Sequence, residues 1–288
     1  MKQYEFSETF NRDPFFNIER IQDNPAHESP RKFDFHSHDY YVIQILTKGS
    51  GTHTIDFRSY DMNPGSVFFL NPGQPHQVTE TSPNEGFIIS FNYEFLARSN
   101  ISLNFIHDIN LFRPFGESPP LHPGSDNFDK ILAYCMEIES CFERSDDFRY
   151  EALGAYLRLL LISCNASCDI RELPPEDLAD NAVETIRNFR ALVEKQFRDW
   201  HRASQYADAL YISVNYLNKL VKTYLGTSTK DYIQDRIILE VKRSLINSGQ
   251  TAKEIAYDLG YKEPSHLSNA FKKCTGISLS DFREHYQS

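Results

Sequence analysis

The last third of the chain repeats a short pattern at an interval of about fifty residues. Tyr216–Lys222 (YLNKLVK) lines up with His266–Lys272 (HLSNAFK) fifty residues later. The same interval pairs further residues, namely Gly226 with Gly276, Ser228 with Ser278 and Tyr232 with Phe282. In both copies the apolar residues recur at helical spacing. The repeat therefore predicts two similar helical units, one after the other in the chain.

Each copy has the start and stop signals of two short helices joined by a tight turn. In the second copy, Thr251 and Glu254 form a capping box that covers the first amide groups of a helix. Gly260 suits a left-handed turn, and Pro264 suits the first position of the next helix. In the first copy, Ser213 caps the second helix. This arrangement is typical of a helix-turn-helix.

The second helix of each copy is expected to have a polar face opposite its apolar one. The inward residues are Leu217, Leu220 and Val221 in the first copy and Leu267, Ala270 and Phe271 in the second. Asparagine pairs with adenine, and lysine reaches guanine or phosphate, so the outward face is a candidate DNA-binding surface. Its residues are Asn215, Asn218, Lys219 and Lys222 in the first copy, and Ser265, His266, Asn269, Lys272 and Lys273 in the second. The alternative is a helical bundle whose polar faces are merely solvated.

Charge is unevenly distributed along the chain. The net charge of −10 by itself argues against a polyanionic partner. Residues 1–180, however, contain 14 Lys and Arg against 28 Asp and Glu, whereas residues 181–288 contain 16 against 12. The mildly basic part coincides with the repeat, which favours nucleic acid as its partner.

Residues 31–91 have the pattern of a β-rich domain. Short apolar runs alternate with turn signals at Lys48–Gly51, near Arg58–Asp61 and at Asn71–Pro75. Strands are predicted over 41–46, 52–57, 66–70, 76–80 and 86–91. Many short strands between Gly and Pro turns indicate a sandwich or barrel.

Beyond residue 91 the apolar spacing becomes helical, over 128–142 and 148–163. The second of these helices has a stripe of large side chains at Leu153, Tyr156, Leu157, Leu160 and Leu161. This stripe either packs on the β domain or forms a dimer seam. Both alternatives bury the same residues, so the sequence leaves the choice open.

The acidic segment DIRELPPEDLAD, residues 169–180, indicates a linker because of its paired prolines. The expected fold class is α+β. Residues 1–168 form a β-barrel with a helical pair, residues 169–182 a linker, and residues 183–288 an all-α domain of two helix-turn-helix subdomains. No run approaches 18 apolar residues, and the N-terminus lacks the apolar core of a signal peptide, so a cytoplasmic location is expected. The five cysteines form no CxxC pair and are expected to be free thiols.

His36 and His38 stand one residue apart in a strand-like run, FHSHDYYVIQ. Residues i and i+2 of a strand point to the same face, so the two imidazoles should converge. Together with His76 they could bind a divalent metal. They could instead orient a compact polar ligand that Tyr40 or Tyr41 covers with an aromatic face. A third possibility is that the histidines only satisfy backbone groups.

The motifs of the repeat resemble the signature of the AraC/XylS transcription regulators over about residues 183–286. The matching segments are Ile255-Ala256, Leu259–Tyr261, Ser265, Leu267-Ser268, Ala270–Lys273, Gly276–Ser278 and Phe282-Arg283. The resemblance implies two helix-turn-helix subdomains joined by a long helix over 230–247. Both recognition helices would enter successive major-groove turns on one DNA face.

The same resemblance implies which side chains read bases. By motif position, the reading residues fall on Asn215, Asn218 and Lys219 in the first copy, and on Pro264, Ser265 and Asn269 in the second. Proline has no donor side chain, so this chain departs from the pattern at that position. Glu263 beside it can instead accept a hydrogen bond from cytosine N4.

Residues 30–92 resemble, more loosely, the cupin-like sensor barrel of sugar-responsive members of the family. The residues that keep the spacing of the two cupin motifs are His36, His38, Gly65, Gly73 and His76. Asn71 stands where proline is usual. The resemblance implies that this region binds a small effector.

A metal site is the less favoured interpretation of this region. Metal-binding cupins add a glutamate three or four residues beyond the second histidine, and here Val42 and Ile43 occupy those places. Gln44 is a poor substitute. We therefore predict a ligand-binding site without metal or other cofactor, composed of His36, His38, Tyr40, Tyr41 and His76.

The expected function is sequence-specific regulation of transcription under the control of a small molecule such as a sugar. The sequence leaves open whether the chain acts as an activator or a repressor. The expected partners are double-stranded promoter DNA, the effector, RNA polymerase and a second copy of the chain, with no membrane. No Ser-His-Asp constellation, P-loop or dinucleotide fingerprint indicates an enzyme. The rival is a metal-dependent cupin enzyme with an appended DNA-binding module. A third reading is a DNA-binding protein whose barrel is only structural.

Overall fold

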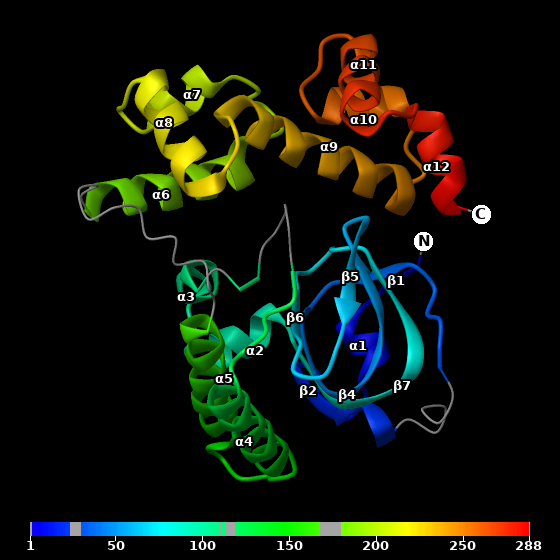
Figure 1. Ribbon diagram of the computed structural model, residues 1–288, viewed down its shortest axis with the longest axis vertical. Coiled ribbons are helices and arrows are strands. Elements are labelled where there is room, and N and C mark those ends of the chain that lie inside the picture. The colour runs from blue at the N-terminus through cyan, green and yellow to red at the C-terminus, as the bar shows by residue number, and fades with distance from the viewer. Residues whose placement is uncertain (1, 24–29, 110, 113–118, 168–179, 288) are drawn as a thin grey trace. The chain divides into compact units, whose positions relative to one another are not determined.

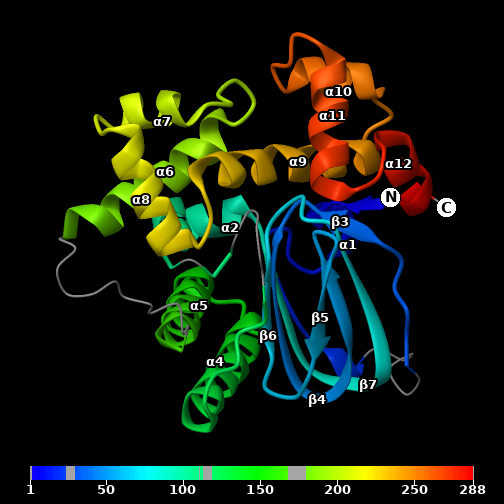
Figure 2. The same cartoon turned by 45° about the horizontal axis from the view of Figure 1, so that its top comes forward.

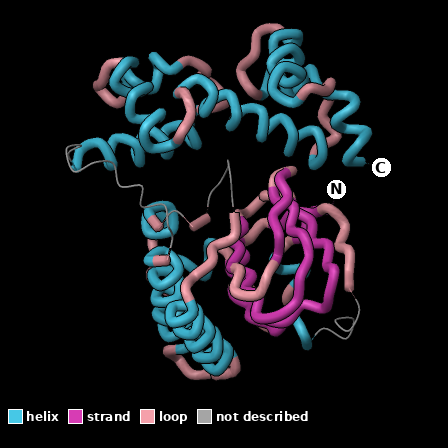
Figure 3. Tube along the Cα trace, in the orientation of Figure 1, coloured by secondary structure: helices cyan, strands magenta, loops and turns pink. Residues whose placement is uncertain are grey.

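The computed structural model describes residues 2–23, 30–109, 111–112, 119–167 and 180–287. The chain divides into two compact units, residues 2–169 and 170–288. Strands occur in the first unit and the second is helical (Figure 3), which confirms the α+β class. The predicted linker falls largely on residues 168–179, outside the described ones, so its boundaries stay a prediction.

The first unit is built on one seven-stranded sheet. Its strands are β1 (Lys2–Tyr4), β2 (Phe16–Arg20), β3 (His36–His38), β4 (Tyr41–Ile55), β5 (Arg58–Met62), β6 (Val67–Leu70) and β7 (His76–Phe91). The main path runs β1-β3-β7-β4-β5, with β2 paired to β7 and β6 paired to β4. The β1–β3 pair is parallel, and the others are antiparallel. The long strands β4 and β7 curve, so the sheet curls round as in a barrel (Figures 1 and 2).

Two predicted chain breaks are wrong, because β4 and β7 continue through them. At Lys48–Gly51, β4 shifts its register against β7 instead of turning. Gly49 has a φ of +101°, and a Cβ there would lie 2.1 Å from Asn84 Oδ1. Gly86 has a φ of +145°, and a Cβ there would lie 1.9 Å from the Ile45 carbonyl oxygen. These glycines permit bulges and a close strand approach rather than turns.

The hairpin between β4 and β5 begins earlier than predicted. Asp56 and Phe57 both have positive φ, +47° and +68°. They form a two-residue loop of the kind that fits the twist of antiparallel strands. The strand expected over 52–57 therefore ends at Ile55, and the expected turn near Arg58–Asp61 lies within β5.

The sheet buries a separate apolar cluster on each face. Alternate residues of β4 divide between them: Tyr41, Ile43 and Ile45 join one cluster, whereas Val42, Leu46 and Ile55 join the other. The first cluster is shared with the helices that follow β7, namely α2 (Tyr93–Arg98), α3 (Leu103–Asp108), α4 (Ser125–Phe142) and α5 (Arg149–Ala166). The leucines of the α5 stripe are fully buried there. The stripe is thus core of the β domain.

The second unit consists of helices. They are α6 (Asp180–Gln196), α7 (Ala203–Ala209), α8 (Val214–Leu225), α9 (Thr229–Asn247), α10 (Ala252–Asp258), α11 (Pro264–Thr275) and α12 (Leu279–Gln287). The pairs α7–α8 and α10–α11 are the two predicted helix-turn-helix units, and α9 is the predicted connecting helix (Figure 1). Among the described residues, no helix is long and apolar enough to cross a membrane.

The predicted capping residues stabilise these helices as expected. The Thr251 hydroxyl accepts from the Glu254 amide at 3.2 Å, and the Glu254 carboxylate accepts from the Thr251 amide at 2.7 Å. Ser213 accepts from the Tyr216 amide at 3.1 Å. Each capped start satisfies amide groups that the helix itself leaves without a partner.

Candidate DNA-binding surface and effector site

The helices α8 and α11 have one apolar and one polar face. Leu217, Leu220 and Val221 of α8, and Leu267 and Phe271 of α11, are fully buried. With one exception, the polar side chains predicted to bind DNA are exposed: Asn215, Lys219, Lys222, Glu263, Ser265, His266, Asn269, Lys272 and Lys273. Each helix-turn-helix therefore has one exposed polar face, which lies on its second helix.

Asn218 is the exception. Its side chain is half-buried, and its Oδ1 accepts from the backbone N–H of Thr229, the first residue of α9, at 3.3 Å. A bidentate pair with adenine needs both the oxygen and the amide nitrogen. The Thr229 amide occupies one of the two lone pairs of that oxygen. Asn218 is thus half-buried beside the start of α9 rather than fully exposed, and its role as a base reader stays a prediction.

The start of α11 explains how Glu263 is presented. Pro264 is the first helical residue, as predicted, and Glu263 is the N-cap residue with no side-chain capping hydrogen bond. Its exposed carboxylate thus stands at the helix N-terminus. Lys272 and Lys273 lie in the last turn of α11, where they also offset the partial negative charge of the helix C-terminus.

Sequence reasoning missed an exposed aromatic side chain in the first helix-turn-helix. Tyr211 is 96% exposed and has a φ of +56° in the turn between α7 and α8. The corresponding residue of the second copy is Gly260, with a φ of +70°. Tyr211 thus takes up the left-handed conformation that glycine usually provides.

The predicted histidines of the barrel do gather, and His76 lies at their centre. His36 pairs with His76 across strands β3 and β7. The ring of His76 lies 4.2 Å from that of His36 and 4.9 Å from that of His38, centroid to centroid. The rings of His36 and His38 are 6.5 Å apart. His38 and His76 are buried, and His36 is half-buried.

A fourth histidine, His53, belongs to this cluster and was missed by sequence reasoning. It is fully buried on β4, and its ring lies 5.4 Å from that of His76 and 4.8 Å from that of Phe68. It pairs with Val78 in the β4–β7 ladder, two residues from the Ile55–His76 pair. Only the long-range register of the two strands brings it there, so no local pattern could have indicated it.

Of the two tyrosines predicted to line the site, only Tyr40 lies beside the histidines. Its ring stacks on His38 with centroids 4.4 Å apart. Tyr41 stacks on Phe91 instead, at 5.2 Å, within the cluster that α4 and α5 cover. The prediction that Tyr41 lines the site is therefore wrong: Tyr41 is the first residue of β4 and packs in the other apolar cluster, whereas Tyr40 lies in the bend between β3 and β4.

Hydrogen bonds to the backbone set the tautomers of the cluster. Nδ1 of His36 lies 2.8 Å from the Asp34 carbonyl oxygen, and Nδ1 of His38 lies 2.7 Å from that of Tyr40. A carbonyl can only accept, so each Nδ1 donates, and Nε2 of a neutral ring is left as an acceptor. In the part of the chain that the structure describes, Nε2 of His38 and both ring nitrogens of His53 are buried without a hydrogen-bond partner.

Burial keeps these imidazoles neutral. Loss of hydration lowers the pKa of His38 to about 4 and that of His53 to about 3. Burial likewise lowers the pKa of His36 and of His76, and the neighbouring histidines add to the effect at His76. Neutral rings with free lone pairs suit a ligand that donates hydrogen bonds through hydroxyl groups.

The residues present do not fit a cupin metal site. Among the described residues, no group of three or more His, Cys, Asp or Glu is arranged to hold a metal ion. The places at which a metal-binding cupin has its glutamate hold Val42 and Ile43, both buried in apolar clusters. Orientation by backbone carbonyls is common to metal-binding histidines, but a matching ligand set is also required.

Two family models match the chain, one in each unit. The "AraC-like ligand binding domain" matches residues 25–132, and a "Helix-turn-helix domain" matches residues 206–285. The chain belongs to the AraC/XylS family. These matches lie on the curled sheet with its first long helix and on the two helix-turn-helix units.

Curated relatives of this AraC-family chain extend over nearly its whole length. The HTH-type transcriptional activator RhaS from Pectobacterium carotovorum (strain PC1) is 21% identical over 266 residues, which is 91% of each chain. RhaS from Escherichia coli O81 (strain ED1a) is 22% identical over 259 residues, 88% of each chain. Among solved structures, ToxT from Vibrio cholerae is 15% identical, with a TM-score of 0.43, over 93% of this chain and 97% of its own.

Proposed function

We propose that this chain regulates transcription by binding promoter DNA through the exposed faces of α8 and α11. One observation supports this above all. Two capped helix-turn-helix units, repeated in sequence, present polar side chains on the helix that such a motif inserts into the major groove. Asn215 and Lys219 of α8, with Ser265 and Asn269 of α11, are the proposed base readers, and Glu263 joins them at the start of α11.

We propose further that a compact polar molecule, such as a sugar, binds at the histidine cluster of the barrel and controls DNA binding. The buried, unpartnered nitrogens of His38 and His53 support this, because a buried polar group without a partner is costly. Hydroxyl groups would donate to Nε2 of His38 and to the unprotonated nitrogen of His53, whose N–H would in turn donate to a hydroxyl oxygen. The ring of Tyr40 would cover an apolar patch of the ligand. A purely structural barrel leaves those nitrogens unexplained.

Several further properties belong to the proposal. Relatives are named transcriptional activators, which favours activation through contact with RNA polymerase at the promoter. We propose a homodimer acting in the cytoplasm, with a linker over 169–182 between the sensing and DNA-binding domains. A metal-dependent cupin enzyme with a DNA-binding module is the alternative, and stoichiometric iron, manganese or zinc in the purified chain would revive it.

DNA binding is tested by selecting duplexes from a random pool with the full-length chain. We expect an enriched site with two segments about one turn, roughly 10 bp, apart. Inserting five base pairs between the segments rotates one of them to the far side of the duplex. Binding should then fall to the non-specific level, a loss of about a thousandfold. The same insertion outside the site is the control, and tolerance of the central insertion would mean that only one unit reads DNA.

The sensing site is tested by thermal shift of the full-length chain against a panel of monosaccharides. A sugar that raises the melting temperature of the wild type should not do so for His53→Ala or His76→Ala. His122→Ala, at an exposed position, is the control. If either cluster variant keeps the full shift while it remains folded, the histidines are not the sensing site.

A further inference from the structure

We infer that the turn of the second helix-turn-helix docks on the segment Phe197–His201, between α6 and α7, and that this contact fixes the spacing of the two DNA segments that the chain reads. The inference rests on the proposed DNA-binding function. It adds a second determinant of spacing to the connecting helix α9. Gly260 is its central residue.

At Gly260 the second helix-turn-helix is in close contact with the segment that precedes the first one. A Cβ added there would lie 2.5 Å from the carbonyl oxygen of Arg198. Real Cβ atoms do not approach an oxygen so closely, so a side chain would force the backbones apart. The next residue continues the contact, since the ring of Tyr261 lies 4.7 Å from that of His201.

Comparison of the two copies shows that the contact with Arg198, rather than the turn itself, requires a glycine at position 260. Tyr211 occupies the corresponding position of the first copy with a similar φ and is almost fully exposed. The backbone bonds correspond as well: the Ile212 amide donates to Ala207, and the Tyr261 amide donates to Ala256. A turn of this kind therefore accommodates a large side chain when nothing opposes it. In the second copy the carbonyl of Arg198 opposes it.

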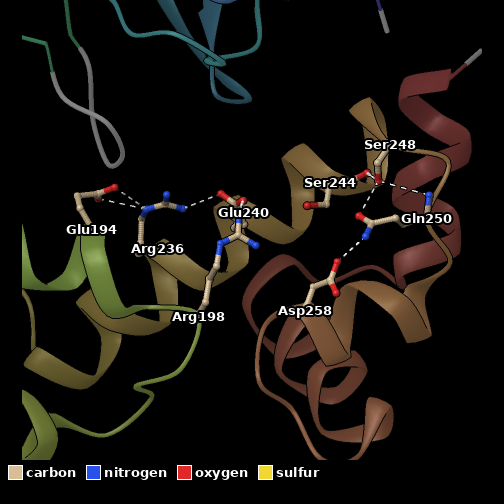
Figure 4. Close-up of polar contacts among 8 residues, drawn as sticks. All are labelled: Glu194, Arg198, Arg236, Glu240, Ser244, Ser248, Gln250 and Asp258. Atoms are coloured by element: carbon tan, nitrogen blue, oxygen red, sulfur yellow. Dashed lines mark hydrogen bonds and ion pairs between the residues drawn. The ribbon is translucent and has the colours of Figure 1, made fainter.

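The docking segment is itself clamped to α9. Arg236 of α9 is buried, with its guanidinium 3.8 Å from the centroid of the Phe197 ring. Its Nε lies 3.1 Å from the carboxylate oxygens of Glu194, and its Nη1 lies 3.1 Å from Glu240. Arg198 forms an ion pair with the same Glu240 (Figure 4). A continuous row of charges thus joins α6, the docking segment and α9.

The second helix-turn-helix is also tied to the far end of α9. Ser248 donates to the Ser244 carbonyl at 2.7 Å and contacts Gln250, which donates to Asp258 of α10 at 2.5 Å (Figure 4). Arg283 of α12 donates to the Leu245 carbonyl at 3.0 Å. The unit is therefore held both at the end of α9 and at Gly260. Two separated attachments prevent the pivoting that one would allow.

The test compares Gly260→Ala with Gly226→Ala in the full-length chain. Gly226 ends α8 with a φ of +69°, and a Cβ there would meet nothing within 4 Å. Both variants therefore suffer the same backbone strain, but only Gly260→Ala forces the second helix-turn-helix away from the docking segment. Affinities are measured on the selected operator and on versions with one base pair added or removed between its segments. One base pair rotates a segment by roughly 35°.

We expect the wild type and Gly226→Ala to prefer the selected spacing by about tenfold or more, the cost of roughly one lost base contact. In Gly260→Ala this preference should fall to about twofold or less. His201→Ala, which removes the ring contact without straining the turn, should reduce the preference part of the way. Equal preferences in Gly260→Ala, His201→Ala and the wild type would overturn the inference. Failure to enrich any operator would instead refute the proposed function on which it rests.

Discussion

The two units differ in where their candidate sites lie: the site of the first unit is buried, and that of the second is on the surface. Among the described residues, fourteen polar or charged side chains are buried in the first unit and two, Thr229 and Arg236, in the second. The barrel holds its candidate site inside, among buried imidazoles. The DNA-binding unit has an apolar interior and presents its candidate site on exposed helix faces. Substitutions at the first site should therefore affect folding and binding together, whereas most at the second should affect binding alone.

Arg236→Met in the DNA-binding unit should be an exception, because it should lower the stability of that unit. Its effect should be the largest of the substitutions proposed here. Arg236 is the one charged side chain buried among the described residues of that unit, and its removal leaves Glu194 and Glu240 without their shared partner. Breaking such a pair costs about 3–5 kcal/mol of unfolding free energy. Trp200 is the only tryptophan in the chain, so its fluorescence during urea unfolding reports on this unit.

Lys195→Met on exposed α6 surface is the matched control and should leave the midpoint nearly unchanged. A wild-type midpoint in Arg236→Met would show that the charge row contributes nothing to stability. Packing alone would then hold the docking segment against α9.

Acid should destabilise the barrel more than the DNA-binding unit. The folded pKa values of His36, His38, His53 and His76 lie below 6.5. Below about pH 6.5 the unfolded chain binds protons that the folded barrel does not, so the barrel loses stability as the pH falls. It regains that stability fully above pH 6.5. For His38, with a folded pKa of about 4, the loss is about 3 kcal/mol.

The measurement is urea unfolding between pH 7 and pH 4.5, with far-UV circular dichroism for the whole chain and Trp200 fluorescence for the second unit. The transition of the barrel should move to lower urea by more than that of Trp200. His38→Asn should reduce the difference. Equal shifts of both transitions would mean that the buried histidines do not govern the acid response.

The same contrast explains what the sequence could predict. The helix-turn-helix units depend on local signals, such as the Thr251 capping box and the spacing of Leu217 and Leu220, and these were predicted correctly. The half-burial of Asn218 does not follow from these local signals, because its partner, Thr229, starts the next helix. In such helical units, contacts within a few residues along the chain set most of the structure.

The barrel depends on partners far apart in the chain. The sequence pattern indicates a turn at Gly49 and the start of a strand at Gly86, yet each faces the backbone of the neighbouring strand where β4 and β7 continue. His53 joins the site only through the pairing of β4 with β7. Period-two alternation divides the residues of β4 between the two faces, but the sequence does not show which face holds the site.

Asn269→Ala and Asn218→Ala should give different losses. Asn269 is exposed on α11, so its loss should lower the affinity for the operator relative to random DNA by about 1–3 kcal/mol. Asn218 accepts from the Thr229 amide at the start of α9, so its loss should lower the stability of the second unit by about 1 kcal/mol, the usual net value of one hydrogen bond. Affinities for the operator and for a random duplex measure the loss of specificity, and urea unfolding followed by Trp200 fluorescence measures the loss of stability. A specificity loss in Asn218→Ala at wild-type stability would restore it as a base reader.

Lys272→Ala should have the smallest effect and act on all DNA alike. Its exposed ammonium group, in the last turn of α11, is expected to contact a phosphate rather than a base. Removing one phosphate contact reduces the slope of log affinity against log salt by about one and weakens operator and random duplex by the same factor. Lys130→Ala, exposed on α4 of the other unit, should change neither quantity. If Lys272→Ala weakens only operator binding and leaves the salt slope unchanged, the side chain reads a base, and the sequence-reading face of α11 extends to its C-terminal end.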